Sequence, residues 1–187
     1  MKPTEFFKKY ALDSIIAAED TAIFPSVMLA QAALESGWGE SGLTKDGNAL
    51  FGIKAAGKAS PYWNGDKYTA PTKEYINGVL TTVQGSFRKY RSVADSLKDY
   101  IHFLKSNPRY EKNGVFAAQT PEEQARALQK AGYAGSNPNY ATKLINTINQ
   151  YNLKQYDQKK KAMKYLELAA AIVSLLLASW TIYKVFK

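Results

Sequence analysis

The sequence of 187 residues contains no cysteine and a single histidine, His102. Disulfide frameworks, thiolate nucleophiles, zinc sites and most histidine-dependent triads are therefore excluded. His102 lies off the apolar face of the helix expected around it, so we interpret it as a solvent-facing side chain. Neither a glycine-rich phosphate loop nor a calcium loop of alternating acidic residues is present, and we expect no cofactor and no metal. The chemistry must then rest on carboxylates, hydroxyls or amides.

The positive charge is unevenly distributed along the chain. The formal net charge is +9, of which residues 1–153 carry +4 and residues 154–187 carry +5. A nucleic-acid-binding domain normally places its basic residues on one stripe among aromatic side chains, and the scattered lysines of residues 1–153 form no such stripe. We therefore expect no nucleic-acid partner.

The C-terminal segment marks the clearest boundary in the chain. A lysine-rich stretch over 154–164 precedes sixteen residues without a charge, 168–183. These sixteen residues would span ~24 Å as a helix, close to the ~30 Å of a bilayer core. We therefore predict a domain over 1–153, a basic linker over 154–164 and a C-terminal hydrophobic, transmembrane helix over 165–187. The alternative is a hydrophobic helix buried against a second copy of the protein.

The body is expected to be mainly α, of the α+β class, with one β-hairpin. Apolar residues recur at helical spacing in four segments that proline or glycine bounds. The expected helices cover about 4–18, 26–36, 93–107 and 137–151, with a shorter one over 121–131 behind a capping box, whereas 44–68 is expected to be a loop. Asn77-Gly78 is a strong signal for a tight turn, so 72–83 is expected to be a hairpin.

Glu35 has several features of a catalytic acid. It lies at the end of the apolar helix 26–36 and precedes Trp38 on a glycine-flanked turn. A carboxylate at such a cleft edge is partly desolvated, which raises its pKa toward the range that a general acid needs. From the residues alone, a solvated glutamate near a helix end is the simpler interpretation. Three further acidic residues are interpreted as helix-surface charges or salt-bridge partners: Asp95, Asp99 and Glu111.

A series of motifs, in order along the chain, resembles one enzyme family. The motifs are Glu35–Ser41 (ESGWGES), Asn48–Lys54, Thr72–Tyr75, Phe87–Ser92, Asn107–Tyr110, Ala131–Ala134 and Pro138–Leu144. Together they cover roughly residues 3–153, which is more specific than any single motif. On these residues the chain resembles the glucosaminidase family of bacterial cell-wall hydrolases, glycoside hydrolase family 73, which includes flagellar rod-cap domains, autolysins and phage lysins.

The resemblance implies a lysozyme-like helical lobe, a small β-hairpin lobe and a cleft between them that binds peptidoglycan glycan strands. The family's catalytic acid corresponds to Glu35, and its second functional carboxylate, on the hairpin, corresponds to Glu74. One carboxylic acid protonates the leaving oxygen, while a carboxylate or the substrate's own acetamido group acts on the other face of the sugar. Glu74 therefore either activates water or only orients the sugar.

The same resemblance gives candidates for substrate binding, because sugars stack on flat aromatic rings. They are Trp38, Asn48, Phe51, Tyr75, Tyr133 and Tyr140. Trp38 is expected to wall the pocket of the acid, and Asn48 and Phe51 to shape the loop beneath the cleft. Tyr133 and Tyr140 either line the cleft or pack in the core. The family's small acidic stretch between these two tyrosines reads Gly-Ser-Asn here, which weakens any role for a carboxylate there.

We predict an endo-β-N-acetylglucosaminidase that cleaves the glycan backbone of peptidoglycan after N-acetylglucosamine. A muramidase of the same fold is the near alternative, because both bonds present similar geometry to one acid. A catalytically vestigial wall-binding or structural virion module belongs to a different class of function. The presence of both Glu35 and Glu74 argues against it.

The expected location is a membrane in a phage particle, with peptidoglycan, the membrane and other virion proteins as partners. The N-terminus has no apolar core typical of a secretory signal, so the C-terminal helix is the expected anchor. More lysines precede this helix than follow it, which favours retention of the body on the cytoplasmic side, away from peptidoglycan. A phage particle that delivers the enzyme to the cell wall removes this conflict between the side of the body and the side of its substrate. A bacterial membrane or envelope is the alternative location.

Overall fold

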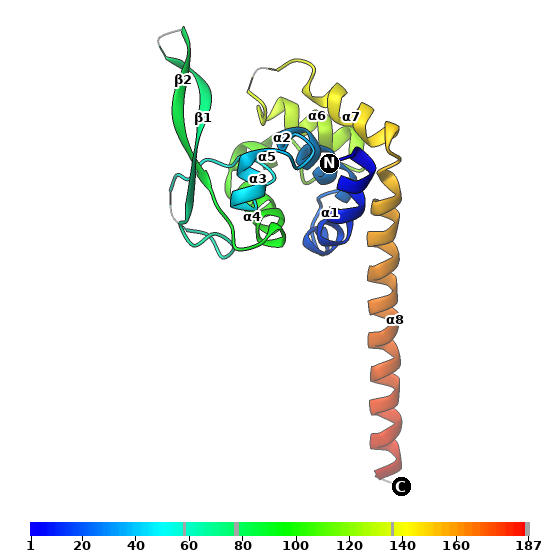
Figure 1. Ribbon diagram of the computed structural model, residues 1–187. Coiled ribbons are helices and arrows are strands. Elements are labelled where there is room, and N and C mark those ends of the chain that lie inside the picture. The colour runs from blue at the N-terminus through cyan, green and yellow to red at the C-terminus, as the bar shows by residue number, and fades with distance from the viewer. Residues whose placement is uncertain (58, 77–78, 136, 186–187) are drawn as a thin grey trace.

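The computed structural model describes residues 1–57, 59–76, 79–135 and 137–185, without the side chains of residues 74, 75, 80, 176 and 178–185 (Figure 1). The elements in chain order are α1 (Pro3–Ala18), α2 (Pro25–Glu35), α3 (Gly42–Gly47), β1 (Lys67–Ile76), β2 (Val79–Arg88), α4 (Val93–Ser106), α5 (Pro108–Lys112), α6 (Pro121–Lys130), α7 (Tyr140–Gln150) and α8 (Lys154–Val185). The fold is mainly helical with one two-stranded sheet, which confirms the predicted class.

Helix α2 forms the centre of the helical lobe. Every residue from Pro25 to Ala33 is buried, and α1, α6, α7 and α8 all contact the helix. A helix that is apolar on all sides is stable only when other elements cover it completely. Pro25 stands at the first helical position, where its missing N–H costs no hydrogen bond. The core therefore holds α2 rigidly, and with it the glutamate at its C-terminal end.

The two strands form a hairpin that projects from the helical lobe (Figure 1). The antiparallel register runs from Lys67 opposite Arg88 to Ile76 opposite Val79, so the hairpin is longer than the predicted 72–83. The loop before β1 extends the pairing at the base of β2, where Arg88 N donates to the carbonyl of Ile53 at 2.8 Å. The predicted turn, residues 77–78, lies outside the described residues.

A buried ion pair fastens the base of the hairpin to α4. Asp99 is completely buried and accepts hydrogen bonds from Arg88 Nη1 at 2.8 and 3.1 Å and from the hydroxyl of Tyr90 at 2.7 Å. Ser60 Oγ donates to the same carboxylate at 2.5 Å, and the Arg88 guanidinium lies 4.5 Å from the ring centre of Trp63. Of the two interpretations of Asp99, a salt-bridge partner is confirmed and a helix-surface charge was wrong, because the charge is compensated inside the protein.

A short helix, α3, overlaps the beginning of the segment 44–68 that was expected to be a loop. Ser41 caps it by accepting a hydrogen bond from Thr44 N at 3.1 Å, and Asn48 ends it in the left-handed conformation, with φ of 52°. Tyr68 of β1 reaches across to this helix and donates to Asp46 at 3.4 Å. A segment of six residues is too short to show the apolar periodicity that predicts a helix, so this helix is recognised only from its caps and its contact with β1.

The segment predicted as a basic linker, 154–164, is instead the first part of α8. Asp157 accepts a hydrogen bond from Ser26 N at 2.8 Å. Lys160 Nζ donates to the carbonyls of Thr21 at 2.7 Å and Ile23 at 3.0 Å. These contacts tie the helix to the loop between α1 and α2, so the compact body extends past Leu153.

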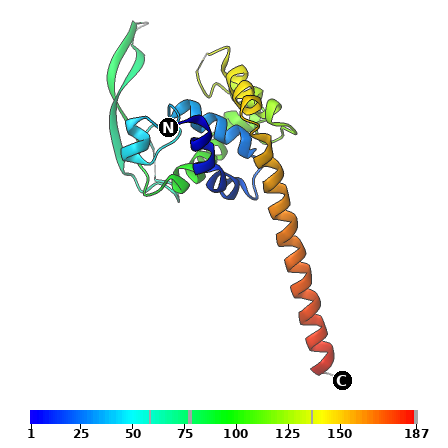
Figure 2. The same ribbon diagram turned by 45° about the vertical axis from the view of Figure 1, so that its right-hand side comes forward.

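Beyond its first turns α8 leaves the body and projects away from it (Figures 1 and 2). Its large apolar side chains are more than half exposed; they are Leu166, Leu168, Ile172, Val173, Leu175 and Leu177. Among the described residues, no helix is long and apolar enough to cross a membrane. The structure therefore confirms a C-terminal helix, and the predicted transmembrane span over 165–187 is not confirmed.

Candidate active site

Glu35 is held by the turn that ends α2. Three successive residues, Gly37, Trp38 and Gly39, have positive φ angles of 57°, 59° and 78°, and glycine adopts such angles without strain. Trp38 N donates to the carbonyl of Ala33 at 2.8 Å, and Gly39 N donates to Ser36 Oγ at 2.8 Å. The sequence Glu-Ser-Gly-Trp-Gly thus closes the helix immediately after the glutamate.

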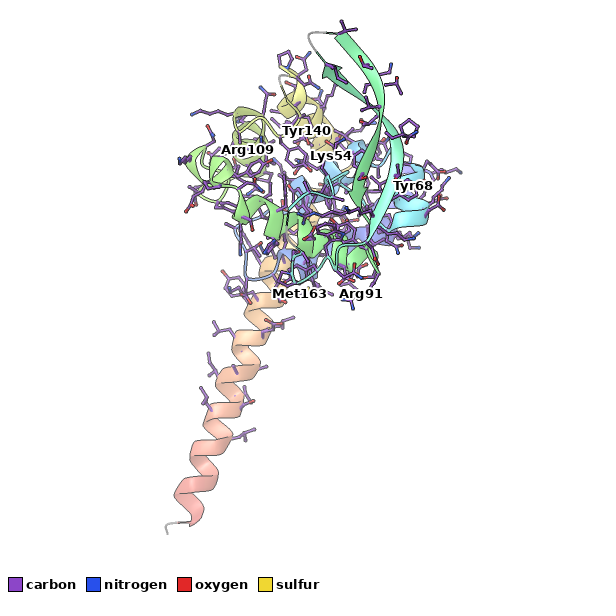
Figure 3. The ribbon with its side chains drawn as sticks, turned by 90° about the vertical axis from the view of Figure 1, so that its left-hand side faces the viewer. Lys54, Tyr68, Arg91, Arg109, Tyr140 and Met163 are labelled. Carbon is purple, nitrogen blue, oxygen red and sulfur yellow. The ribbon has the colours of Figure 1, made fainter. Side chains whose placement is uncertain are left out.

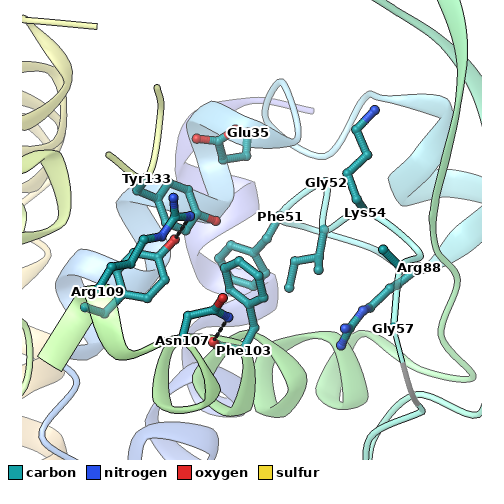
Figure 4. A pocket seen from close by; sticks show the side chains of 13 residues that line it. Glu35, Phe51, Gly52, Lys54, Gly57, Arg88, Phe103, Asn107, Arg109 and Tyr133 are labelled. Atoms are coloured by element: carbon teal, nitrogen blue, oxygen red, sulfur yellow. Dashed lines mark hydrogen bonds between the residues drawn. The ribbon is translucent and has the colours of Figure 1, made fainter. Parts of the chain in front are cut away.

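A pocket of about 550 Å³ opens beside Glu35 (Figure 4). Its walls come from the end of α2, the loop after α3, the base of β2, the junction of α4 with α5, and the loop between α6 and α7. The lining residues are Glu35, Phe51, Gly52, Ile53, Lys54, Ala56, Gly57, Arg88, Phe103, Asn107, Arg109, Tyr110 and Tyr133. The volume is within the range of ligand pockets, and the lining mixes aromatic rings with a few charges.

The carboxyl group of Glu35 has a raised pKa. Its side chain reaches solvent at the mouth of the pocket, but surrounding protein atoms displace much of its water, and this burial raises the pKa. The hydroxyl of Tyr140 donates to Glu35 Oε1 at 3.0 Å, which stabilises the charged form and opposes part of the shift. Burial prevails, so the group is suited to hold a proton and release it, as a general acid must.

Glu40, the other carboxylate of the same motif, has the opposite environment. Lys45 Nζ lies 2.5 Å from Glu40 Oε2, and the N-terminal amine of Met1 pairs with the other oxygen. These two cations lower the pKa of Glu40 to about 2. Glu40 is therefore ionised near neutral pH, whereas Glu35 is the carboxyl group of the motif whose pKa is raised.

A buried hydrogen-bonded chain lies behind Glu35. Tyr140 OH accepts from Gln31 Nε2 at 2.8 Å, and Gln31 in turn accepts from the hydroxyl of Tyr100. Gln31 and Tyr100 are completely buried, and Tyr140 is 4 % exposed. The ring of Tyr133 stacks on that of Tyr140, with centroids 5.8 Å apart and planes at 17°. The side chains of Tyr100, Gln31 and Tyr140 are hydrogen-bonded in sequence up to Glu35, and this network fixes the position of the Tyr140 hydroxyl.

Comparison with known proteins identifies the family and the fold of this chain. The family model described as "Glucosaminidase: Mannosyl-glycoprotein endo-beta-N-acetylglucosaminidase" matches residues 12–153. The chain belongs to the glucosaminidase family. Peptidoglycan hydrolase FlgJ of Escherichia coli is 40 % identical over 149 residues, which cover 78 % of this chain and 45 % of that protein. Exo-glucosaminidase LytG of Bacillus subtilis is 34 % identical over 84 % of this chain and 54 % of its own length.

Solved structures of this family have the same fold. The glycoside hydrolase domain of Salmonella typhimurium FlgJ superposes with a TM-score of 0.62 at 39 % identity, covering 81 % of this chain and 98 % of that one. The catalytic domain of the autolysin Auto from Listeria monocytogenes gives a TM-score of 0.71 at 32 % identity, covering 82 % and 86 %. The chain spans about half the length of the curated relatives it matches.

Two of the predicted substrate-binding residues line the pocket. Phe51 stacks on Tyr100, with ring centroids 4.1 Å apart and planes at 19°, and Tyr133 stands beside Glu35 (Figure 4). Both alternatives for Tyr133 hold, because its ring packs against Tyr110 and Tyr140 and also faces the pocket. Tyr140 is buried behind Glu35 and acts on the acid through its hydroxyl.

Two other predicted residues, Trp38 and Asn48, lie outside the pocket. The ring of Trp38 packs in an aromatic cluster with Phe6, Phe7 and Tyr151, because the left-handed turn directs it toward α1. Asn48 Nδ2 donates to the carbonyl of Tyr90 at 3.0 Å and so ties α3 to the segment after β2. Trp38 therefore does not wall the acid's pocket, and Asn48 shapes the loop as expected without facing the pocket.

The hairpin residues Glu74 and Tyr75 are placed by their backbone alone. Glu74 lies opposite Thr81 and Tyr75 opposite Leu80 in the register, near the tip of the hairpin. Their side chains lie outside the described residues. The assignment of Glu74 as the second carboxylate and of Tyr75 as a sugar contact stays a prediction.

Sequence reasoning missed three cationic residues of the pocket and the glutamine behind it. Lys54, Arg88 and Arg109 all line the pocket, and each falls inside or beside a motif that was noted only for its family resemblance. Gln31 carried a signal of its own, since an amide in the middle of an otherwise apolar helix must find a buried partner. That partner, Tyr140, is 109 residues away along the chain.

Removing the Tyr140 hydroxyl is expected to raise the pKa of Glu35 further. In Tyr140→Phe the carboxylate loses the hydrogen bond that favours its charged form, so the alkaline limb of kcat/KM moves to higher pH. The amide of Gln31 also loses its acceptor, which costs about 1–3 kcal/mol of stability. The pH profile of glycan cleavage measures the first effect and urea unfolding the second. Tyr156→Phe, outside the pocket, is the control, and an unmoved alkaline limb in Tyr140→Phe would contradict the role of the hydroxyl.

Proposed function

We propose that this glucosaminidase hydrolyses the glycan backbone of peptidoglycan as an endo-β-N-acetylglucosaminidase, with Glu35 as the general acid. The observation that carries the proposal is the position of Glu35, a carboxyl group of raised pKa at the edge of a 550 Å³ pocket and fixed by Tyr140. The relatives named peptidoglycan hydrolases and glucosaminidases support the substrate class.

In the proposed reaction Glu35 donates its proton to the glycosidic oxygen as the bond from that oxygen to the anomeric carbon breaks. Positive charge develops on the anomeric carbon. In one route water attacks that carbon from the opposite face and gives a proton to Glu74. In the other route the substrate's acetamido oxygen attacks first, and water then opens the resulting ring and gives a proton to the ionised Glu35. Glu74 stands on the hairpin, which the Arg88–Asp99 pair anchors beside the pocket. In this proposal the hairpin is the element that brings the second carboxylate to the sugar.

Analysis of the products tests the proposed bond specificity. Purified cell walls digested by the protein, reduced with borohydride and examined by mass spectrometry are expected to give N-acetylglucosaminitol at the new ends. Muramitol ends would establish a muramidase instead. The similarity to exo-glucosaminidase LytG favours an exo mode as the second candidate, and early products of one short length, in place of a range of lengths, would establish it. The absence of any new ends would establish the vestigial wall-binding module.

We further propose that α8 attaches the enzyme to a membrane. The support is its row of large apolar side chains, more than half exposed from Leu166 to Leu177, preceded by the lysine-rich turn 159–164, which favours anionic lipid. A membrane of a phage particle, with other virion proteins as partners, stays a prediction that rests on the sequence.

The membrane proposal predicts different behaviour for two lengths of the chain. The full chain is expected to sediment with anionic vesicles at both low and high salt, because burial of apolar side chains does not depend on ionic strength. A chain ending at Lys164 keeps the contacts of Asp157 and Lys160 with the body and is expected to stay in the supernatant at high salt. Release of the full chain by salt alone would contradict insertion and favour burial of α8 against a second copy.

A further inference from the structure

The pocket beside Glu35 contains a cation, Arg109, that forms no ion pair with the described residues. Arg88 is neutralised by Asp99 at 2.8 Å, whereas no ion pair among the described residues involves Arg109. Arg109 lines the pocket from the beginning of α5 and is exposed to it. Figure 3 places Arg109 and Lys54 apart, with Lys54 nearer the hairpin, and Figure 4 shows Glu35 between the two sides.

The guanidinium of Arg109 is held in place by its neighbour. Its Nη2 donates to the hydroxyl of Tyr110 at 2.6 Å, and its central carbon lies 4.7 Å from the centre of the Tyr110 ring. Tyr110 is completely buried and packs against Tyr133 of the pocket wall. A guanidinium has five N–H donors, and the bond to Tyr110 uses one of them. Because the Tyr110 ring already holds the Arg109 guanidinium in place, binding a ligand through the other donors costs less side-chain entropy.

The substrate class of the proposed function contains a matching anion. Peptidoglycan alternates a neutral sugar, N-acetylglucosamine, with a sugar that bears a lactyl ether, N-acetylmuramic acid. That substituent ends either in its own carboxylate or in a stem peptide that carries carboxylates. A strand that passes Glu35 has the two kinds of sugar on opposite sides of the scissile bond.

We propose that Arg109 forms a subsite for a carboxylate on the muramic-acid substituent, so that the sugar on the α4–α5 side of Glu35 is the muramic acid. This inference rests on the proposed function, since it takes peptidoglycan as the substrate. Arg109 then sets the register of the strand, because a neutral sugar on that side leaves the guanidinium without its partner. Planar bidentate pairing with carboxylates is the chemistry for which arginine is suited.

The test compares how tightly charged and neutral glycan strands bind to protein variants that lack the proposed catalytic acid. Glu35→Gln and the double variant Glu35→Gln with Arg109→Gln are titrated with amidase-treated glycan strands, which have free lactyl carboxylates, and with the same strands after coupling of the carboxyls to methylamine. Strands that retain their stem peptides, charged and methylamidated, form the second pair of ligands. Arg109→Lys, which keeps the charge without the fork, and Arg126→Gln, an exposed arginine outside the pocket, are the matched controls.

Arg109→Gln is expected to weaken binding of the charged strands about tenfold, and of the methylamidated strands less than about twofold, as for loss of one charge-assisted contact. Arg109→Lys is expected to weaken binding of the charged strands by an intermediate factor. Arg126→Gln is expected to bind all strands as tightly as the Glu35→Gln variant does. An effect on amidase-treated strands assigns the lactyl carboxylate, and an effect confined to peptide-bearing strands assigns a peptide carboxylate.

Equal weakening of charged and neutral strands, or no weakening of either, would overturn the subsite, as would the absence of any detectable binding. Failure of the proposed function has a different signature. It shows as unchanged cell walls after treatment with the unmodified protein, whereas the Arg109 comparison is made in a chain without the catalytic acid.

Discussion

Replacing Glu35 by glutamine is expected to reduce glycan cleavage by about 10²–10⁴-fold, because the amide keeps the shape of the side chain but has no proton to give to the leaving oxygen. The measurement is release of soluble fragments from purified cell walls, with kcat and KM determined on isolated strands. Glu40→Gln is the matched control, since Glu40 belongs to the same motif but is held ionised by Lys45 and the N-terminal amine. It is expected to cleave like the unmodified protein.

The fold of the Glu35→Gln variant is expected to be intact. Burial raises the pKa of Glu35, so the folded state binds its proton more tightly than the unfolded state. The ionised carboxyl then lowers stability at neutral pH, and this effect disappears as the pH falls below the pKa of an unfolded glutamate. The glutamine variant should therefore melt no lower than the parent at pH 7. Activity above about a tenth of the parent would show that Glu35 is not the acid.

The hairpin carboxylate is expected to matter less than Glu35. Its task can be shared with water or with the acetamido group of the substrate, so Glu74→Gln should lower kcat more than it raises KM and should leave measurable cleavage. The same wall assay serves for this variant. An unchanged rate would make Glu74 a surface residue of β1.

Replacing Asp99 by alanine is expected to cost about 3–5 kcal/mol of folding free energy, the range found when one partner of a buried ion pair is removed. Asp99 is completely buried and the Arg88 side chain is 11 % exposed, so the arginine would be left charged without its counterion. Tyr90 and Ser60 would lose their shared acceptor at the same time. Urea unfolding followed by circular dichroism measures the loss.

Asp95→Ala is the control for Asp99, because Asp95 lies on the same helix and pairs with the exposed Arg91 at 3.9 Å. Its expected cost is below about 1 kcal/mol, as for other surface pairs. Since Arg88 lies in the pocket and on β2, the Asp99 variant should also lose cleavage at temperatures where it remains folded. A cost for Asp99→Ala as small as that of Asp95→Ala would show that the pair does not anchor the hairpin.

Local signals were sufficient where one element carries the whole pattern. The apolar segment 26–36 with its proline start and glycine stop predicted α2, and Asn77-Gly78 between alternating residues predicted a hairpin. Such signals failed where a distant partner decides the outcome. The sequence left Asp99 as either a helix-surface charge or a salt-bridge partner, and only its contacts with Arg88 of β2 and with Tyr90 show that it is a buried ion-pair partner. The sequence likewise predicted a linker over 154–164, because the hydrogen bond between Asp157 and Ser26 joins distant parts of the chain.

The sequence by itself determined the family, the mainly helical class and Glu35 as the candidate acid, because these depend on motifs whose residues are neighbours along the chain. Only the tertiary structure decided the direction in which the pKa of Glu35 shifts and which residues line its pocket. The pKa of a carboxyl depends on which atoms displace its water and which donor reaches it, and Tyr140, the donor, comes from 105 residues away. For the same reason Trp38, three residues from Glu35, turns toward α1, whereas Arg109, far along the chain, faces the pocket.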